Sequence, residues 1–302
     1  MKSVAIILPP MIGDSLMTIP LITELENNNI ILSIYTNEYC YNVISYFLKS
    51  KNIFKTKNKT KNNFDFIFDF LSNKESKELL KTIKSHCIIG FPDGQFDYHL
   101  HLDLPREYSD KPAPEIFLQA LKYLNILTPK EYSFKRTINW EYTNQRKIVL
   151  APSAGNINRC YPLNDFIELA EKLSSAGQVV EFLLGPSDLH LKEKLKLQKI
   201  RISSNIKNTL DYLQTAKLIV ASEGGLMHIS GCFGIPLLGL FKVSKIINWF
   251  PYSLAFQKAL GHETNDYVNI AKLNMDIISA LHTIDVIDSQ IYPIRKICRK
   301  NE

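Results

Sequence analysis

The chain has 302 residues, of which 45% are hydrophobic and 22% charged, and its 36 Lys and Arg outnumber 30 Asp and Glu for a net charge of +6. The apolar content excludes a chain disordered as a whole, and 12 Gly and 5 Cys exclude collagen-like and disulfide-scaffold proteins. The length fits two domains of about 150 residues each. The mild positive charge permits an anionic partner such as a phosphate and gives no indication of nucleic acid.

The first apolar run, Val4–Leu8, ends at Pro9 and Pro10 and is too short for a signal peptide. No apolar run reaches the roughly 18 residues that a membrane span needs. The cysteines are scattered without a C-x-x-C pair, which is typical of free thiols in a reducing compartment. We therefore expect a cytoplasmic protein.

Short apolar runs alternate with helical patterns along most of the chain. In the first half we expect strands over Val4–Leu8, Ile30–Tyr35, Phe64–Asp69 and Cys87–Gly90, and helices over Ser15–Glu26, Glu38–Leu48, Lys74–Lys84 and Pro114–Leu124. In the second half we expect strands over Ile148–Ala151, Val179–Leu184, Arg201–Ser203, Leu218–Ala221 and Leu237–Phe241, and helices over Leu163–Ser175, Leu189–Leu197, Thr209–Thr215 and Leu226–Phe233. This alternation predicts an α/β fold with parallel sheets built from βαβ units.

The alternation weakens between Phe91 and Lys147, which predicts two domains, 1–145 and 146–284. The basic, amphipathic tail, 285–302, could pack back on the first domain. The lysine-rich segment Lys49–Asn63 fits a solvated loop, or else a basic arm for lipid headgroups or a phosphorylated acceptor.

Ligands of open α/β sheets bind beyond the carboxyl ends of the strands, where polar side chains gather in this sequence. After the first strand, Gly13 allows a tight turn and Asp14 stands at a helix start. Asp14 fits a helix N-cap, and a carboxylate in this place could also serve as a general base.

Two loops of the second half have the composition of phosphate sites. In APSAGNINRC, the small residues Ser153 and Gly155 let backbone amides approach a phosphate, and Arg159 could add a charged contact. Asp188 opens a helix in LGPSDLH, where a structural cap and a ligand contact are equally compatible with the sequence.

A third loop, ASEGGLMHIS, places two glycines before a helix, whose exposed amides favour an anion. Glu223 could accept hydrogen bonds from hydroxyl groups. His228 falls in the first turn of this helix, where a ligand contact and a structural role are both open. The members of this loop that we select are Glu223, Gly224, Gly225 and His228.

Metal binding is weakly indicated. His99, His101 and Asp103 alternate on a possible strand face, but no other ligand cluster accompanies them and no D-x-D pair occurs. We expect no metal site.

Three regions together resemble glycosyltransferase family 9, the ADP-heptose:lipopolysaccharide heptosyltransferases. VAIILPPMIGDSLMTIPLITEL resembles the opening strand, G-D and T-x-P helix of that family. IVLAPSAGNINRCYPLNDFIELAEKL resembles its P-G-A, basic residue and W-P. LIVASEGGLMHISGCFGIPLLGLF resembles its D-S-G-P-x-H-x-A-A-x-G-x-P segment. The matches keep their order and spacing over nearly the whole chain.

The resemblance implies a GT-B fold, in which two Rossmann-like domains with parallel sheets face across a cleft. It places the acceptor on the first domain and the nucleotide sugar on the second, with inverting transfer that needs no metal and no cofactor. Asp14 matches the general base, and Arg159 takes the place of a basic phosphate ligand that is usually Lys. Glu223 stands where Asp is usual and Tyr161 where Trp is usual. The longer Glu side chain would shift the donor contacts and alter sugar preference or weaken binding.

We expect transfer of a heptose or related sugar from a nucleotide-diphosphate sugar, with ADP as the expected nucleotide, to a hydroxyl of a lipopolysaccharide core-type acceptor. Two alternatives are a nucleotide-sugar epimerase of the same fold and a degenerate binder of nucleotide sugars. Basic residues of the tail could hold the enzyme at an anionic membrane surface: Arg295, Lys296, Arg299 and Lys300.

Overall fold

The computed structural model describes residues 1–48, 52–58, 62–92, 96–103, 110–130, 132, 147–196, 198–202, 205–251, 257–261 and 276–277. The chain forms two compact units. The first comprises Met1–Asn139 and Ile247–Tyr252, and the second Trp140–Ile246 and Ser253–Glu302. The expected boundary and the tail 285–302 lie outside the described residues. The sequence did not predict that Ile247–Tyr252 groups with the first unit.

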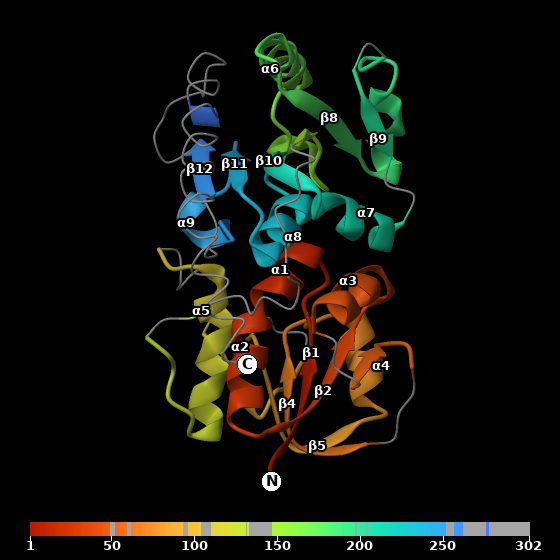
Figure 1. Cartoon of the computed structure of the whole chain (residues 1–302). Helices are drawn as coiled ribbons and strands as arrows, with labels where there is room; N and C mark the ends of the chain where they lie inside the picture. Colours follow the sequence, from red (N-terminus) through yellow and green to blue (C-terminus); the bar gives the residue numbers. More distant parts are fainter. Residues whose placement is uncertain are drawn as a thin grey trace, which may run out of the picture. The chain divides into compact units, whose positions relative to one another are not determined.

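The first unit alternates strands and helices from its start (Figure 1). Its strands are β1 (Ser3–Ile7), β2 (Ile31–Thr36), β3 (Ile53–Lys55), β4 (Asn63–Asp69), β5 (Lys84–Gly90) and β6 (Leu100–His101). Its helices are α1 (Ile12–Met17), α2 (Ile19–Asn27), α3 (Glu38–Leu48), α4 (Lys74–Leu80), α5 (Ala113–Leu118) and the 3-10 helix η2 (Gln119–Leu124). The returning chain adds all of α9 (Ile246–Trp249) except its first residue.

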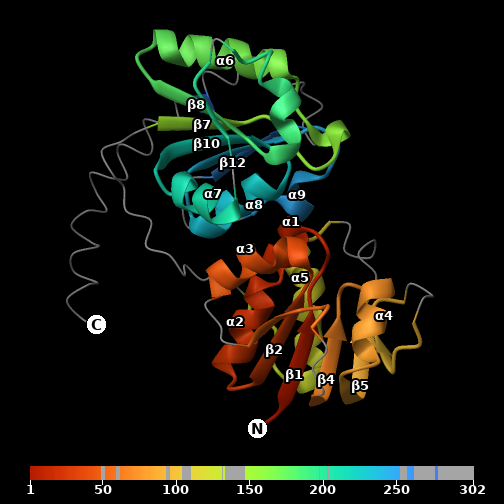
Figure 2. The ribbon, with the colours of Figure 1, turned by 90° about the vertical axis from the view of Figure 1, so that its right-hand side faces the viewer.

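The strands of the first unit form one parallel sheet in the order β3-β2-β1-β4-β5-β6. Figure 2 shows β2, β1, β4 and β5 side by side in this order. One core cluster joins β1 and β4 to the α4 segment, with Ile7, Ile67 and Leu79 among its members. The continuous apolar runs of the sequence are thus buried central strands.

The expected helix Ser15–Glu26 is two helices, α1 and α2, that meet at Thr18. Pro20 lies in the first turn of α2 and has no N–H to continue the hydrogen bonding of α1. The Thr18 hydroxyl donates to the Ser15 carbonyl at 2.6 Å and so provides a hydrogen-bond donor to this carbonyl where α1 ends. The proline therefore ends α1 after six residues.

The lysine-rich segment Lys49–Asn63 contains an edge strand that the sequence did not predict. β3 pairs with β2, and Lys55 forms an ion pair with Glu38 of α3 at 2.6 Å. The described part of this segment is therefore partly a β-strand, and not only a solvated loop.

The second unit repeats the alternation. Its strands are β7 (Lys147–Ala151), β8 (Val179–Leu184), β9 (Ile200–Ile202), β10 (Ala216–Ser222), β11 (Leu237–Phe241) and β12 (Gln257–Gly261). Its helices are α6 (Leu163–Ser175), α7 (Ile206–Leu213), α8 (Gly225–Phe233) and the 3-10 helices η3 (Ile157–Arg159) and η4 (Pro186–Leu191). The α-helix expected over Leu189–Leu197 is wrong, because Gly185 and Pro186 begin the short η4 instead.

The second sheet is also parallel, in the order β12-β11-β10-β7-β8-β9. Alternate residues of β7, β8 and β10 pack against α6, with Leu150, Phe182, Val220 and Phe166 in one cluster. Each sheet therefore reverses its strand order once, between β1 and β4 in the first unit and between β7 and β10 in the second. Such reversal points are where open α/β sheets bind ligands.

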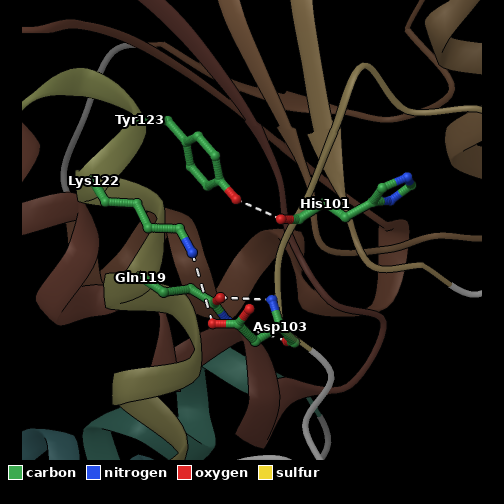
Figure 3. A network of polar contacts seen from close by, with 5 residues as sticks. All are labelled: His101, Asp103, Gln119, Lys122 and Tyr123. Carbon is green, nitrogen blue, oxygen red and sulfur yellow. Dashed lines mark hydrogen bonds and ion pairs between the residues drawn. The ribbon is translucent and has the colours of Figure 1, made fainter.

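Side-chain contacts fasten the edge strand β6 of the first unit to η2 (Figure 3). The Gln119 carboxamide accepts from the Asp103 amide at 2.7 Å and donates to the Asp103 carbonyl at 3.3 Å. The Tyr123 hydroxyl donates to the His101 carbonyl, and Lys122 reaches the Asp103 carboxylate at 3.7 Å. Gln119 is buried, whereas Lys122 is exposed, so the two contacts differ in solvation.

No helix among the described residues is long and apolar enough to span a membrane. Cys40, Cys87, Cys160 and Cys232 are free thiols, and Cys298 lies outside the described residues.

Because Gln119 is buried and Lys122 is exposed, we expect their contacts with Asp103 to contribute differently to stability. A Gln119→Ala substitution should lower the free energy of unfolding by about 1–3 kcal/mol, because it removes both partners of the Asp103 backbone. Lys122→Ala is the matched control and should change it by less than about 0.5 kcal/mol, since exposed ion pairs contribute little. Urea unfolding followed by circular dichroism measures both. Equal losses for the two variants would contradict this assignment.

Candidate functional site

The candidate site residues selected in the second half of the sequence all lie at the carboxyl edge of the second sheet. Ser153, Gly155 and Arg159 follow β7, Asp188 follows β8, and Glu223 to His228 follow β10. Since β7 and β10 are neighbours in register, their following loops emerge side by side at the reversal point.

A buried hydroxyl joins the two central loops. Ser222, the last residue of β10, donates from its Oγ to the Pro152 carbonyl at 2.8 Å. The same oxygen accepts from the Tyr161 amide at 3.0 Å. One side chain therefore satisfies two backbone groups on either side of the Ser153–Cys160 loop and fixes that loop to β10.

Arg159 and Glu223 form an ion pair across these loops. The Arg159 Nη1 lies 3.3 Å from the Glu223 Oε1, and the Glu223 side chain is 1% exposed whereas that of Arg159 is 42% exposed. A buried carboxylate needs such a cation, because transferring an unpaired charge from water costs several kcal/mol. The guanidinium has five N–H donors, so its exposed side can still bind an anion.

His228 lies in α8 beside this ion pair and is buried. Burial, and secondly the charge of Arg159, lower the pKa of His228 to about 4, so the imidazole is neutral near pH 7. Its Nδ1 is buried and makes no hydrogen bond to any described residue. A neutral ring nitrogen in this position can serve a ligand as donor or acceptor, according to its tautomer.

The two glycines before α8 have different roles. Gly224 is the N-cap, in an extended conformation, and a Cβ added there would lie 3.2 Å from the Ala154 Cβ. The close approach of the two loops therefore favours glycine at this position. Gly225 is the first residue of α8, where the helix leaves backbone N–H groups for an anion.

Asp188 organises the outer side of the site. Its Oδ2 accepts from the Ser153 hydroxyl at 2.6 Å and from the Gly185 amide at 2.9 Å. Asp188 therefore joins the loops after β7 and β8 and orients the Ser153 hydroxyl.

The Cys160 thiol is a structural element that the sequence did not indicate. Its Sγ accepts from the Ala154 amide at 3.2 Å, which closes the loop between them. The amide of Ala154 is thus engaged within the protein. Gly155 lies exposed at the outside of this loop.

Asp14 belongs to the first unit, at the carboxyl end of β1. The N-cap of α1 is Met11, and Asp14 is the third helical residue, so the cap interpretation is wrong. The side chain is partly exposed, and its charge contributes to the raised pKa of the buried Cys40 thiol, though burial is the main cause. Gly13 is buried in the same turn.

The described residues contain no group of three or more His, Cys, Asp or Glu placed to hold a metal ion. The ring Nδ1 of His99 accepts from the Ile88 amide, and Asp103 is paired with Lys122. These contacts give both side chains structural roles.

The sequence failed to indicate Ser222 and Cys160, which act on the backbone of the site. Both have small side chains whose hydrogen bonds depend on which loops the sheet order brings together. Only their locations in the sequence indicated these roles: Ser222 ends a strand, and Cys160 ends a loop.

The family model of glycosyltransferase family 9 (heptosyltransferase) matches residues 61–273, which is more than half of the chain. No curated protein sequence matches the chain.

Solved structures share the fold. The E. coli heptosyltransferase WaaC with ADP is 15% identical, with a TM-score of 0.74 over 92% of this chain and 99% of that one. E. coli ADP-heptose lps heptosyltransferase II is 15% identical, with a TM-score of 0.74 over 94% and 100%. The family 9 glycosyl transferase from Veillonella parvula DSM 2008 is 15% identical, with a TM-score of 0.72 over 94% and 97%. The two parallel six-stranded sheets are thus those of the GT-B glycosyltransferases, as expected from the sequence.

Replacing Ser222 by Ala tests the joint between the loops. We expect a loss of about 1–3 kcal/mol in the free energy of unfolding, because the Pro152 carbonyl and the Tyr161 amide lose their buried partner. Ser174→Ala, on the exposed side of α6, is the control and should have little effect. Urea denaturation measures both variants; unchanged stability of Ser222→Ala would contradict the role given to this hydroxyl.

The low pKa of His228 predicts a pH dependence of stability. Between pH 6.5 and about 4 the unfolded chain binds a proton at this ring that the folded chain does not, so stability falls as the pH is lowered through this window. The slope from this group approaches about 1.4 kcal/mol per pH unit. A His228→Gln variant should lose that part of the slope in urea unfolding series from pH 7 to 4.5. Parallel curves for the two proteins would contradict the buried neutral ring.

Proposed function

Since the chain belongs to glycosyltransferase family 9, we propose that it transfers a sugar from a nucleotide-diphosphate sugar to a hydroxyl of a lipopolysaccharide core-type acceptor. The sugar is a heptose or a related one, and ADP is the expected nucleotide. The observation that carries the proposal is the convergence of Arg159, His228 and the start of α8 at the reversal point of the second sheet.

The chemistry of these groups suits a diphosphate. The exposed side of the Arg159 guanidinium supplies charged N–H donors, and the backbone amides at Gly224 and Gly225 add neutral ones. His228 stays neutral and hydrogen-bonds a phosphate or sugar oxygen. Together they stabilise the negative charge that develops on the leaving nucleoside diphosphate, which is the largest electrostatic requirement of the reaction.

Asp14 is the proposed general base. Its carboxylate takes the proton from the acceptor hydroxyl while the acceptor oxygen forms a bond to the anomeric carbon. The bond from that carbon to the diphosphate oxygen breaks, and the nucleoside diphosphate leaves with the electron pair. Attack from the face opposite the leaving group inverts the anomeric configuration. The cation beside the diphosphate is Arg159, so the proposed reaction uses no metal ion and no cofactor.

Glu223 is proposed to act on the donor mainly through Arg159. Its buried carboxylate fixes one edge of the guanidinium, and the additional methylene relative to Asp changes where that guanidinium lies. The expected change in sugar preference or affinity would therefore result from a shifted Arg159 guanidinium.

A cytoplasmic location, with contact to the inner face of an anionic membrane, completes the proposal. Its support is the charge of the sequence, and the tail lysines and arginines lie outside the described residues.

The test separates donor binding from transfer. A thermal-shift panel of ADP-, UDP- and GDP-sugars should identify the nucleotide through stabilisation of the folded chain by the bound ligand. An Asp14→Asn variant should keep this shift and lose transfer about 10²–10⁴-fold, because it removes only the base. Glu26→Gln, an exposed carboxylate of α2, is the control and should leave transfer unchanged.

Other outcomes would contradict the proposal. Near-normal transfer by a folded Asp14→Asn variant would exclude the base. Conversion of the nucleotide sugar without an acceptor would identify an epimerase, and nucleotide-sugar binding without any turnover would identify a degenerate binder.

A further inference from the structure

The loop between β1 and α1 contains two consecutive prolines, Pro9 and Pro10. A proline has no backbone N–H, so its carbonyl is the one backbone group with which it can form a hydrogen bond. The α1 helix that follows has only six residues, and its N-cap, Met11, makes no side-chain hydrogen bond to it. The position of Asp14, in the first turn of α1, therefore depends in part on the groups that bind the two proline carbonyls.

Asn37 connects this loop to the start of α3. Its Nδ2 donates to the Pro10 carbonyl at 2.7 Å, and its Oδ1 accepts from the Cys40 amide at 2.8 Å. The Asn37 carbonyl accepts from the Tyr41 amide at 3.0 Å, which makes Asn37 the N-cap of α3. The carboxamide therefore uses its acceptor within α3 and its donor on the loop that leads to Asp14.

Two further side chains donate to the same pair of carbonyls. The Cys40 Sγ donates to the Pro10 carbonyl at 3.3 Å, and the Ser15 Oγ donates to the Pro9 carbonyl at 2.7 Å. Burial raises the pKa of the Cys40 thiol to about 11, a contact with Ser15 opposes the rise, and the charge of Asp14 adds to it. The thiol therefore remains a protonated donor near pH 7. We refer to the three donating side chains as the diproline clamp: Ser15, Asn37 and Cys40.

The diproline clamp connects the ends of two neighbouring strands. β1 and β2 pair in parallel with Ile7 opposite Tyr35, so the loops after them emerge side by side at the carboxyl edge of the sheet. α1 and α3 pack against each other there (Figure 2). Ser15 and Cys40 are completely buried, whereas Asn37 is partly exposed. Asn37 is therefore the member of the clamp that can be replaced with the least effect on the core.

On the basis of the proposed function, we propose that Asn37 is a positioning residue for Asp14. By binding the Pro10 carbonyl, Asn37 fixes the first turn of α1 and with it the carboxylate that takes the proton from the acceptor hydroxyl. Proton transfer requires the base within hydrogen-bond reach of that hydroxyl, and a displacement of about 1 Å can lower the rate about 10²-fold. The proposed donor site lies in the second unit, so the role of Asn37 concerns proton transfer and not nucleotide-sugar binding.

An Asn37→Ser variant of the full chain isolates this role. Serine is also a favoured N-cap, so α3 keeps its cap, but the serine side chain is too short to reach the Pro10 carbonyl. We expect kcat to fall about 10–10²-fold, with an unchanged KM and thermal shift for the nucleotide sugar. Transfer is measured as release of nucleoside diphosphate from the nucleotide sugar that the thermal-shift panel selects, with deacylated lipopolysaccharide core oligosaccharide as the acceptor.

The Asp14→Asn background tests whether Asn37 acts through Asp14. In that background Asn37→Ser should change the residual transfer less than about twofold, because the carboxylate that it positions has been removed. Asn28→Ser is the matched control. The Asn28 carboxamide donates to the Glu24 carbonyl at 2.8 Å at the end of α2, and its replacement should leave kcat unchanged.

Hydrogen–deuterium exchange tests the diproline clamp without any substrate. Asn37→Ser should speed exchange of the α1 amides about three- to tenfold, and Asn28→Ser should not. The inference is overturned if these amides exchange at the same rate, if kcat is unchanged, or if the fall in kcat is equally large in the Asp14→Asn background. Absence of transfer by the unaltered chain would instead remove the proposed function, and the exchange experiment alone would then decide whether Asn37 holds α1.

Discussion

The hydroxyl of Ser222 holds the second unit's site together. Ser222 is buried, and its hydroxyl connects the end of β10 to the loop after β7, the two strands at which the sheet order reverses. Where the strand order of a parallel sheet reverses, the loops after the two central strands lie side by side, but the sheet itself does not bond them to each other. A short side chain at the end of β10 supplies the missing connection, and the Arg159–Glu223 pair and the close contact of Gly224 with Ala154 both depend on the resulting loop position.

The first unit solves the same problem with different chemistry. Asp69 is the last residue of β4, as Ser222 is of β10, and these two strands hold equivalent places in the same strand order. Asp69 gathers two backbone amides and a tyrosine hydroxyl, whereas Ser222 connects one carbonyl and one amide. In each unit a buried polar group at this place organises the loop that follows the strand.

The sequence was sufficient for the architecture, because buried parallel strands and amphipathic helices have distinct periods. Elements such as Glu38–Leu48 and Leu163–Ser175 agree with the structure in both bounds. The short strands β3, β6 and β12 escaped prediction, since a strand of two or three residues has no period and β12 lacks a β-branched run. The glycine- and arginine-bearing loops were selected from the sequence because anion binding restricts residue types, and the structure places them after the neighbouring strands β7 and β10. The roles of Asp69 and Ser222 were not recognisable, because their partners are set by strand order rather than by neighbours in sequence.

The return of Ile247–Tyr252 to the first unit has a consequence for biosynthesis. Asn248 donates to the Lys111 carbonyl at 2.6 Å, and so a residue made late completes a unit whose other part ends at Asn139. A ribosome releases the chain from its N-terminus, so the first unit waits for most of the second before its last segment arrives. Termination of synthesis before Ile247 therefore leaves both units incomplete, and completion of the first unit depends on synthesis of most of the second.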